Sequence, residues 1–244
     1  MKVKFIGTGT MGSTTRANTS FLVDDKILFD CGMGTVKQLE RLKLQVKNIK
    51  CLVISHYHAD HFFDIPNLLM GKKIRKECSE KLYIILPVGG RRKVIDMLEF
   101  SFGDGDINAF EDIEEKYNVE FIELQKDSKY IFGNYEITAI ELKHGNCIPT
   151  YGYLLKNSNT ILGYTGDTGI TDNFFRMCEL ADYMLVDTTW LNPINNDNHI
   201  SFEDLKEYAK KYTSCKFFAV HRGDYEVLDS GDVNIPNDAD EINI

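Results

Sequence analysis

The 244-residue sequence has no run of apolar residues long enough to cross a membrane, and the apolar run at its start is too short for a signal peptide. None of its six cysteines forms a Cys-x-x-Cys pair, and their spacing shows no disulfide framework. We therefore expect free thiols, no membrane partner, and the reducing cytoplasm as the location.

Basic residues are fewer than acidic ones. The chain has 28 Lys and Arg against 37 Asp and Glu, a net charge of −9, which argues against a protein whose main activity is to grip long nucleic acid. Two basic runs, at 72–76 and 91–93, are interpreted as solvated surface in preference to a binding site.

Strand and helix patterns alternate at both ends of the chain, and the middle is rich in strands. Strands are predicted at 3–6, 20–23, 27–30, 51–54, 82–86, 119–124, 130–132, 135–142, 151–156, 160–164, 183–186 and 217–220. Helices are predicted at 34–44, 64–73, 91–100, 172–180 and 201–212. Because no linker divides the halves, this order predicts one domain, 1–244, of the α/β (α+β) class: two sheets face to face with helices outside, in four layers.

Histidine is scarce, and its placement is the most informative feature. Three of the six histidines lie within six residues, in the motif His56-x-His58-x-Asp60-His61, directly after the apolar strand predicted at 51–54. Imidazole is the commonest neutral zinc ligand, and a His-x-His pair on a loop can aim both rings at one ion. The aspartate and the third histidine add enough donors to begin a second metal site. The other histidines are His144, His199 and His221, each close to a turn or a strand end.

This motif resembles the signature of the metallo-β-lactamase superfamily, whose fold is an αββα sandwich with metals at one sheet edge. Further segments fall in the order found in the ribonuclease Z-like phosphodiesterase branch, namely 7–10, 16–20, 28–32, 166–168, 186–189, 199–204 and 220–222. The resemblance extends over nearly the whole chain.

The resemblance implies two zinc ions per chain, and it assigns seven ligands. One ion would be held by His56, His58 and His144, the other by Asp60, His61 and His221, with Asp167 bridging them. Nitrogen and oxygen ligands without thiolate suit Zn²⁺, and Mn²⁺ or Fe is an alternative. A hydroxide shared by the two ions would be the nucleophile, and Asp60 could also orient it.

The remaining histidine, His199, is assigned by the resemblance to stabilising the transition state or protonating the leaving oxygen. It precedes Ser201, which we expect to cap a helix with Asp204 three residues further on. For Asp187 two interpretations stay open: a carboxylate that orients a histidine, or a surface or capping residue.

The substrate is argued from what the chain lacks relative to the tRNA-processing enzymes it resembles. Those enzymes usually carry a long tRNA-binding insertion between the equivalents of His144 and Asp167, but here only 23 residues separate the two, enough for a hairpin. Those enzymes usually have a glycine three residues beyond the motif, where this chain has Asp64. The chain resembles most closely the compact dimeric enzymes that open 3′,5′-cyclic nucleotides, including those that phages use against cyclic-nucleotide defence signalling. We therefore expect a homodimer that acts on a small nucleotide.

Alternatives remain. A ribonuclease Z-type endoribonuclease processing tRNA 3′ ends is the runner-up, since the basic runs could support RNA on a partner subunit. A lactonase or thioesterase shares the fold, and a binding module without activity is disfavoured because no ligand is missing. Recognition of a base by Tyr151, Tyr153 or Trp190 is conceivable, although a core position is the favoured interpretation for all three.

Overall fold

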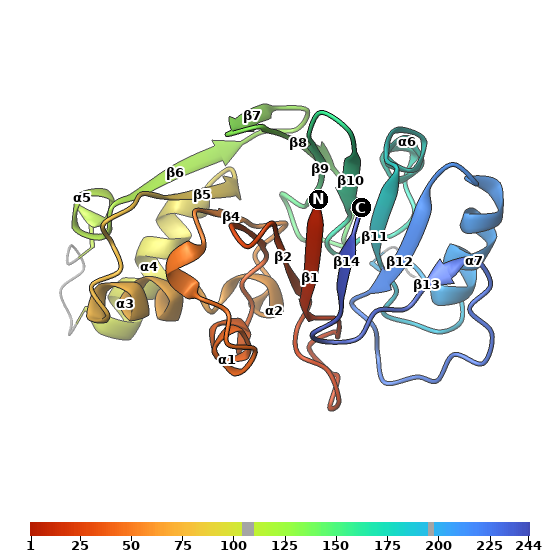
Figure 1. The fold of residues 1–244 in the computed structure, drawn as a ribbon, viewed down its shortest axis with the longest axis horizontal. Helices are drawn as coiled ribbons and strands as arrows, with labels where there is room; N and C mark the ends of the chain where they lie inside the picture. The colour runs from red at the N-terminus through yellow and green to blue at the C-terminus, as the bar shows by residue number, and fades with distance from the viewer. Residues whose placement is uncertain (104–109, 195–197) are drawn as a thin grey trace.

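The computed structural model describes residues 1–103, 110–194 and 198–244, and within them two mixed β-sheets form the centre of the molecule (Figure 1). The first sheet contains β1 (Lys2–Gly7), β2 (Ser20–Val23), β3 (Ile27–Phe29), β4 (Cys51–Val53), β5 (Leu82–Pro87), β6 (Val119–Leu124) and β14 (Glu241–Asn243). The second contains β7 (Lys129–Phe132), β8 (Tyr135–Glu141), β9 (Tyr151–Lys156), β10 (Ile161–Tyr164), β11 (Tyr183–Asp187), β12 (Lys216–Val220) and β13 (Val233–Asn234).

Helices cover the outer faces of both sheets. They are α1 (Thr35–Arg41), α2 (Ala59–Phe62), α3 (Ile65–Ile74), α4 (Gly90–Phe102), α5 (Ile113–Tyr117), α6 (Asp172–Leu180) and α7 (Phe202–Lys211), with a 3₁₀ turn at Val46–Asn48. Residues of α1, α3 and α4 pack on the first sheet, and residues of α6 and α7 pack on the second. The predicted four-layer sandwich is therefore confirmed.

The two sheets are built alike. In each, one part is antiparallel (β14-β1-β2-β3 and β7-β8-β9-β10) and the other is parallel (β3-β4-β5-β6 and β10-β11-β12-β13). Parallel strands bring their carboxyl ends to one edge, which is where open α/β sheets place functional residues. The loops that leave β4, β10, β11 and β12 at those ends carry the residues described below.

The core lies between the sheets and is rich in aromatic rings. Phe21 stacks on Phe29 at 4.6 Å, and Tyr164 meets Phe21 edge-on at 4.9 Å. The strand at Cys51–Val53 is fully buried, as its wholly apolar sequence predicts for a strand covered on both faces.

All the predicted helices and strands are present, although many of them begin or end at residues other than the predicted ones. The helix predicted at 34–44 ends at Arg41, because Lys43 adopts a left-handed conformation (φ 57°). The carboxylate of Asp64, where the resemblance expects glycine, accepts a hydrogen bond from the Val36 backbone N–H at 2.7 Å and so anchors the start of α1. Five short elements were not predicted: α2, α5, β13, β14 and the 3₁₀ turn at Val46–Asn48.

The C-terminal residues, expected to be a tail, form β14, which pairs antiparallel with β1. The two chain ends consequently lie side by side, and the Ile244 backbone N–H donates to the Met1 carbonyl at 2.8 Å (Figure 1). All six cysteines are free thiols, as expected. In the part of the chain that the structure describes, every helix is too short or too polar to traverse a bilayer.

Candidate metal centre

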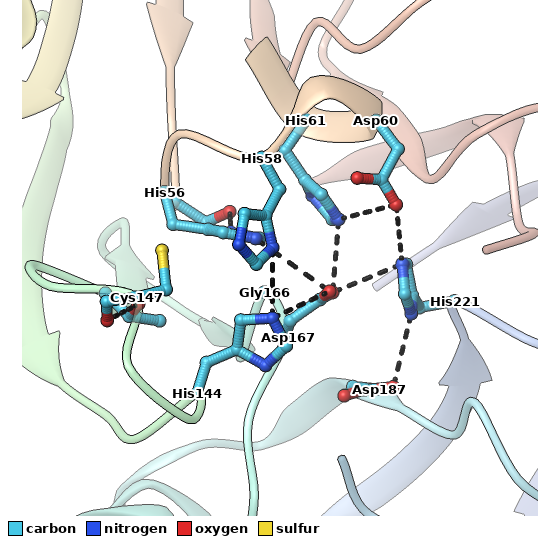
Figure 2. A network of polar contacts seen from close by, with 12 residues as sticks. His56, His58, Asp60, His61, His144, Cys147, Gly166, Asp167, Asp187 and His221 are labelled. Carbon is cyan, nitrogen blue, oxygen red and sulfur yellow. Dashed lines mark hydrogen bonds and ion pairs between the residues drawn. The ribbon is translucent and has the colours of Figure 1, made fainter. Parts of the chain in front are cut away.

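The predicted ligands come from both halves of the chain and meet at the carboxyl edge of the parallel strands (Figure 2). The motif residues follow β4 and run into α2. His144 follows β8, Asp167 follows β10, and His221 follows β12. Residues more than 160 positions apart in the sequence are thus in contact: His221 Nε2 lies 3.2 Å from Asp60 Oδ2.

The seven residues form two groups that share Asp167. One group is His56, His58, His144 and Asp167; the other is Asp60, His61, Asp167 and His221. Within each group the donor atoms all lie within 4.8 Å of one another. The second group is fully buried, whereas the first includes the exposed His58 and therefore opens to solvent. The structure thus brings the seven residues together in the division that the resemblance implied.

Four of the five histidines in these groups are held from outside by an oxygen atom on their Nδ1 side. The distances are 3.0 Å from His56 to Ser55 Oγ, 2.7 Å from His61 to Asp30 Oδ2, 2.7 Å from His144 to the Asn198 carbonyl, and 2.8 Å from His221 to Thr189 Oγ1. Such contacts fix the ring orientation and the tautomer of metal-binding histidines.

Their inner atoms suit a cation. His56 Nε2, His61 Nε2 and Asp167 Oδ1 are buried and make no hydrogen bond. A buried polar atom without a hydrogen bond costs about 1–3 kcal/mol. Ion pairs of Asp167 Oδ1 with His61 Nε2 at 3.1 Å and with His221 Nε2 at 3.3 Å offset part of this cost, and a bound cation would offset the rest. Nitrogen and carboxylate donors in this number fit one or two divalent ions of the zinc type.

Electrostatics keep the carboxylates of the centre ionised. Burial raises the pKa of Asp167, but the charges of His221 and His61 outweigh it and hold this pKa well below its usual range. Burial lowers the pKa of His221, but the charge of Asp167 and hydrogen bonds to Asp187 and Asp60 raise it to about 10. The carboxylates of Asp60 and Asp167 are therefore ionised at neutral pH.

Asp30 is a buried residue beside the candidate ligands that the sequence analysis missed. It is fully buried, and its carboxylate accepts hydrogen bonds from Ser55 Oγ at 2.9 Å and from the Tyr164 hydroxyl at 2.6 Å, besides its contact with His61. Its φ of 55° is left-handed, as is that of His221 at 52°. Strained backbone of this kind persists only where the surroundings impose it. The available signal was an acid at the end of a buried strand.

Glycine is required where two loops approach the ligands. A Cβ on Gly32 would lie 1.7 Å from the Asp60 carbonyl, so only glycine lets this loop pack against α2. Gly166 has a φ of 57°, and a side chain there would also collide with Ser55.

Asp187 and Thr189 connect His199 to the metal centre. Asp187 is fully buried, and its Oδ2 lies 2.8 Å from His199 Nδ1, while its Oδ1 accepts from Thr189 Oγ1 at 2.8 Å. Its oxygens also accept from the Thr168 and Thr189 backbone N–H groups. These contacts favour the orienting interpretation of Asp187. Asp187 also forms a third possible metal-binding group with Asp167, His199 and His221. The carboxylate oxygens of Asp187, however, already accept hydrogen bonds.

The His199 ring lies at the open side of the centre. Its centroid is 4.8 Å from the ring of His144 and 5.6 Å from the ring of His221, and its side chain is 16% exposed. Burial lowers the pKa of His199, but the charge of Asp187 and its hydrogen bond outweigh this and raise the pKa. The predicted cap is confirmed: Ser201 Oγ accepts from the Asp204 N–H at 3.0 Å and begins α7.

Cys147 is, after Asp30, a second residue that contacts a candidate ligand and that the sequence analysis missed. Its half-buried thiol hydrogen-bonds the imidazole of His58, the histidine whose outer partner is not an oxygen. Burial acts to raise the pKa of Cys147, but the hydrogen bonds of His58 and Thr150 lower it. Cys147 belongs to neither group of candidate ligands.

The three aromatic residues considered for base recognition divide in two. Tyr151 and Tyr153 are 5% and 0% exposed and belong to the core between the sheets, as the favoured interpretation predicted. For Trp190 that interpretation is wrong: it is 42% exposed, and its ring lies 6.5 Å from that of His199.

The basic run at 91–93 is largely neutralised within the chain. Arg91 pairs with Glu114 at 2.6 Å, and Arg92 pairs with Asp96, Glu99 and Glu111 at 2.6–2.9 Å. In the other run, Lys72 is buried, and Arg75 pairs with Glu77 at 3.0 Å.

The αββα layers and the histidine motif at the sheet edge define a metallo-β-lactamase-fold protein of the ribonuclease Z-like branch. Within it, residues 1–232 match the family described as Anti-Pycsar protein Apyc1, and the chain belongs to this family.

Curated relatives include two archaeal ribonucleases Z. That of Methanosarcina acetivorans is 30% identical over 178 residues, which cover 67% of this chain and 47% of the relative. That of Pyrococcus abyssi is 23% identical over 278 residues, covering 91% and 86%. The chain thus spans about half the length of the first relative.

Solved structures share the whole fold. Human tRNase Z, short form, has a TM-score of 0.79 at 21% identity, and the match covers 100% of this chain and 99% of that one. The metallo-β-lactamase fold protein YhfI of Bacillus subtilis has a TM-score of 0.76 at 22% identity, covering 99% and 98%. A diphosphatase of the PhnP family has a TM-score of 0.73 at 17% identity, covering 100% and 97%.

Proposed function

We propose that this protein is a dinuclear-metal phosphodiesterase that hydrolyses a small phosphodiester, a 3′,5′-cyclic nucleotide. The observation that carries the proposal is the double group of donors around Asp167, with three buried atoms left without hydrogen bonds. His56, His58 and His144 would hold one ion, Asp60, His61 and His221 the other, and Asp167 both. Zinc fits best, with Mn²⁺ or Fe as alternatives.

Two bound divalent ions would supply Lewis acidity and make water nucleophilic at neutral pH. The chain's own residues do the rest. Asp60, fixed by its contact with His221, would orient the attacking water. Water adds to phosphorus, one ester bond to the ribose breaks, and the leaving oxygen takes a proton. His199 would donate that proton from Nε2, because Asp187 occupies its Nδ1.

The size of the substrate is inferred from the stretch between His144 and Asp167. Its strands β9 and β10 pair as an antiparallel hairpin within the second sheet. The described chain there thus has no projecting arm that could hold a tRNA. The pairing of Arg91 and Arg92 with acids also supports a small substrate over RNA.

An endoribonuclease of ribonuclease Z type is the second candidate. The curated relatives that carry this name favour it, although the first spans twice the length matched here. A lactonase or thioesterase has no such observation behind it.

The test is metal analysis followed by a substrate panel. We expect two metals per chain, and fewer than two would contradict the dinuclear site. Loaded and chelator-treated protein are then assayed with 3′,5′-cyclic nucleotides, bis(p-nitrophenyl) phosphate and pre-tRNA. Metal-dependent opening of a cyclic nucleotide supports the proposal. Efficient cleavage of pre-tRNA, with cyclic nucleotides untouched, would make the second candidate correct.

The proposal includes a homodimer of single-domain chains located in the cytoplasm, as the resemblance implies. Light scattering on the purified protein tests the mass, and a monomer at micromolar concentration would refute the dimer. A single calorimetric transition is expected for one domain, and two separate transitions would count against it.

A further inference from the structure

We propose that Trp190 is the platform on which the nucleobase of the substrate stacks, so that this one side chain selects nucleotides over other phosphodiesters. The inference rests on the proposed phosphodiesterase function and adds a recognition residue to it. It starts from the unusual exposure of a large aromatic side chain beside the candidate proton donor.

Trp190 is the single tryptophan of the chain, and it lies three residues after Asp187 at the end of β11. Its side chain is 42% exposed, although indole is among the most favourable groups to bury. The ring meets the His199 ring edge-on, at 6.5 Å and 82°. The indole and imidazole planes are thus nearly perpendicular, and the exposed part of the indole surface is available to a ligand.

The backbone at Trp190 is held firmly. Its carbonyl accepts a hydrogen bond from the Phe202 N–H at 2.7 Å, and it forms an isolated bridge with Ser201, the cap of α7. Because the backbone is fixed, only the side-chain torsions of Trp190 remain to be ordered when a ligand stacks on it, which favours binding.

The position of Trp190 also suits a nucleotide whose phosphate lies at the candidate metal centre and whose base lies further out. His199 is next to three aromatic rings, since its centroid lies 6.5 Å from the indole and 4.8 Å and 5.6 Å from the rings of His144 and His221. A phosphate at the metal centre would leave the ribose oxygen near His199 and the base beyond it, toward Trp190. Two further exposed apolar side chains, Ile148 and Ile170, lie on the loops that carry His144 and Asp167.

Stacking explains what kind of selectivity to expect. Every base has an aromatic face, so stacking is tolerant of base identity and contributes about 1–3 kcal/mol per base. We therefore expect Trp190 to distinguish nucleotides from base-free phosphodiesters, with a graded preference for bases of larger ring area.

The kinetic test uses Trp190→Ala and Trp190→Phe, with Phe100→Ala as the control, since Phe100 is 94% exposed on the distant α4. Trp190→Ala should raise KM for a cyclic nucleotide about 5- to 100-fold with kcat nearly unchanged. Trp190→Phe should restore most of the loss, and Phe100→Ala should behave as wild type. Opening of an abasic ribose 3′,5′-cyclic phosphate, followed by ³¹P NMR, should be the same in all four proteins.

The binding test uses fluorescence, because excitation at the red edge of absorption reports on position 190 alone. Nucleoside 5′-monophosphates added to metal-loaded wild type should quench the emission saturably, and ribose 5-phosphate should not. Cyclic-nucleotide opening with unchanged KM in Trp190→Ala and no quenching would overturn the stacking role while the proposed function stands. If no cyclic nucleotide is opened, the proposed function is wrong. If the nucleotides also fail to quench the emission, the proposed stacking role of Trp190 is wrong as well.

Discussion

At the scale of single residues, the metal centre depends on atoms that lie one contact away from the ligands. Oxygen atoms of Ser55, Asp30, Asn198 and Thr189 hold four histidines, and the thiol of Cys147 holds the fifth, His58. Because His58 belongs to the open group, the two proposed metal positions would differ in solvent access and in the side chains that support their ligands.

We expect Cys147→Ala to weaken one metal position selectively. Loss of an outer partner of a metal-binding histidine typically lowers affinity about 10- to 100-fold. Competition with a chromogenic chelator should show one ion bound more weakly and the other unchanged, with Cys147→Ser between. Cys78→Ala, at the other half-buried cysteine, is the control. Equal weakening of both ions would contradict the assignment of Cys147 to His58.

His199→Ala should reduce kcat about 10²- to 10⁴-fold, the usual contribution of a general acid. Both metals should remain bound, because His199 belongs to neither of the two groups around Asp167 that would hold them. Asp187→Asn should cause a smaller loss, since it disturbs the orientation of His199 and leaves the ring in place. Steady-state kinetics with metal analysis on the same samples checks this, and retained turnover in His199→Ala would remove its role.

The residues that the sequence could predict are those whose type alone suggests chemistry. The six histidines and the motif around Asp60 are conspicuous, and the resemblance that they carry implied the seven proposed ligands, Asp167 included. Ser55, Thr189 and Cys147 could not be predicted, because a hydroxyl or thiol is common and acquires meaning only from the histidine that folding brings beside it. Trp190 was misjudged because hydrophobicity predicts burial only on average.

At the scale of elements, two helix caps offer a matched pair. Ser201 caps α7, two residues after His199, and Thr171 caps α6, which carries no candidate site residue. Replacing either by alanine should cost about 1 kcal/mol of unfolding free energy. Ser201→Ala should also lower kcat, because the α7 start positions His199, whereas Thr171→Ala should leave kcat unchanged. Equal kcat in the two variants would show that the Ser201 cap does not position His199.

The loop at 10–16 depends on one carboxylate. Asp224 accepts hydrogen bonds from Ser13 Oγ at 2.6 Å and from the Thr14 N–H at 2.7 Å, and these contacts hold its pKa well below the usual range. Asp224→Ala should speed amide hydrogen exchange at Thr14, and Asp224→Asn should do so less.

The sign of the pH effect follows from that lowered pKa. The carboxylate contact is present above the ordinary aspartate pKa and is lost as the pH falls through the lowered value. Wild type should therefore approach the exchange rate of Asp224→Ala only in strong acid. A loop in wild type that loosens already at pH 5 would show that Asp224 does not anchor it.

Element length explains which parts of the fold were predictable. Helices such as α4 and α7 contain enough turns for a periodic pattern, and strands such as β4 have wholly apolar sequences. The helix α2 has four residues, two of them polar (Asp60 and His61), so no periodicity marks it. The strand β14 is defined by its pairing with β1 at the other end of the chain, which local sequence cannot reveal.

At the scale of the whole molecule, the metal centre joins the two similarly built sheets. The loop after β4 supplies His56, His58, Asp60 and His61, and loops of the second sheet supply His144, Asp167 and His221. Metal that binds only the folded chain stabilises it, by about 4 kcal/mol when free metal exceeds the dissociation constant 1,000-fold.

Chelation should therefore lower Tm by on the order of 10 °C for a chain of this size. Asp167→Ala should abolish most of that difference, because Asp167 belongs to both groups. Scanning calorimetry with and without EDTA, and with zinc restored, makes the comparison. A Tm that does not respond to chelator in wild type would show that metal binding and folding are not linked.

The same division of ligands suggests a use for the chain as two pieces. A cut in the turn between β6 and β7 would leave each fragment with part of the ligand set, and neither with a complete site. Reassembly would restore the centre and would also return β14 to its place beside β1. The protein could thus be rebuilt as a pair of fragments whose association, and whose activity, respond to the concentration of free zinc.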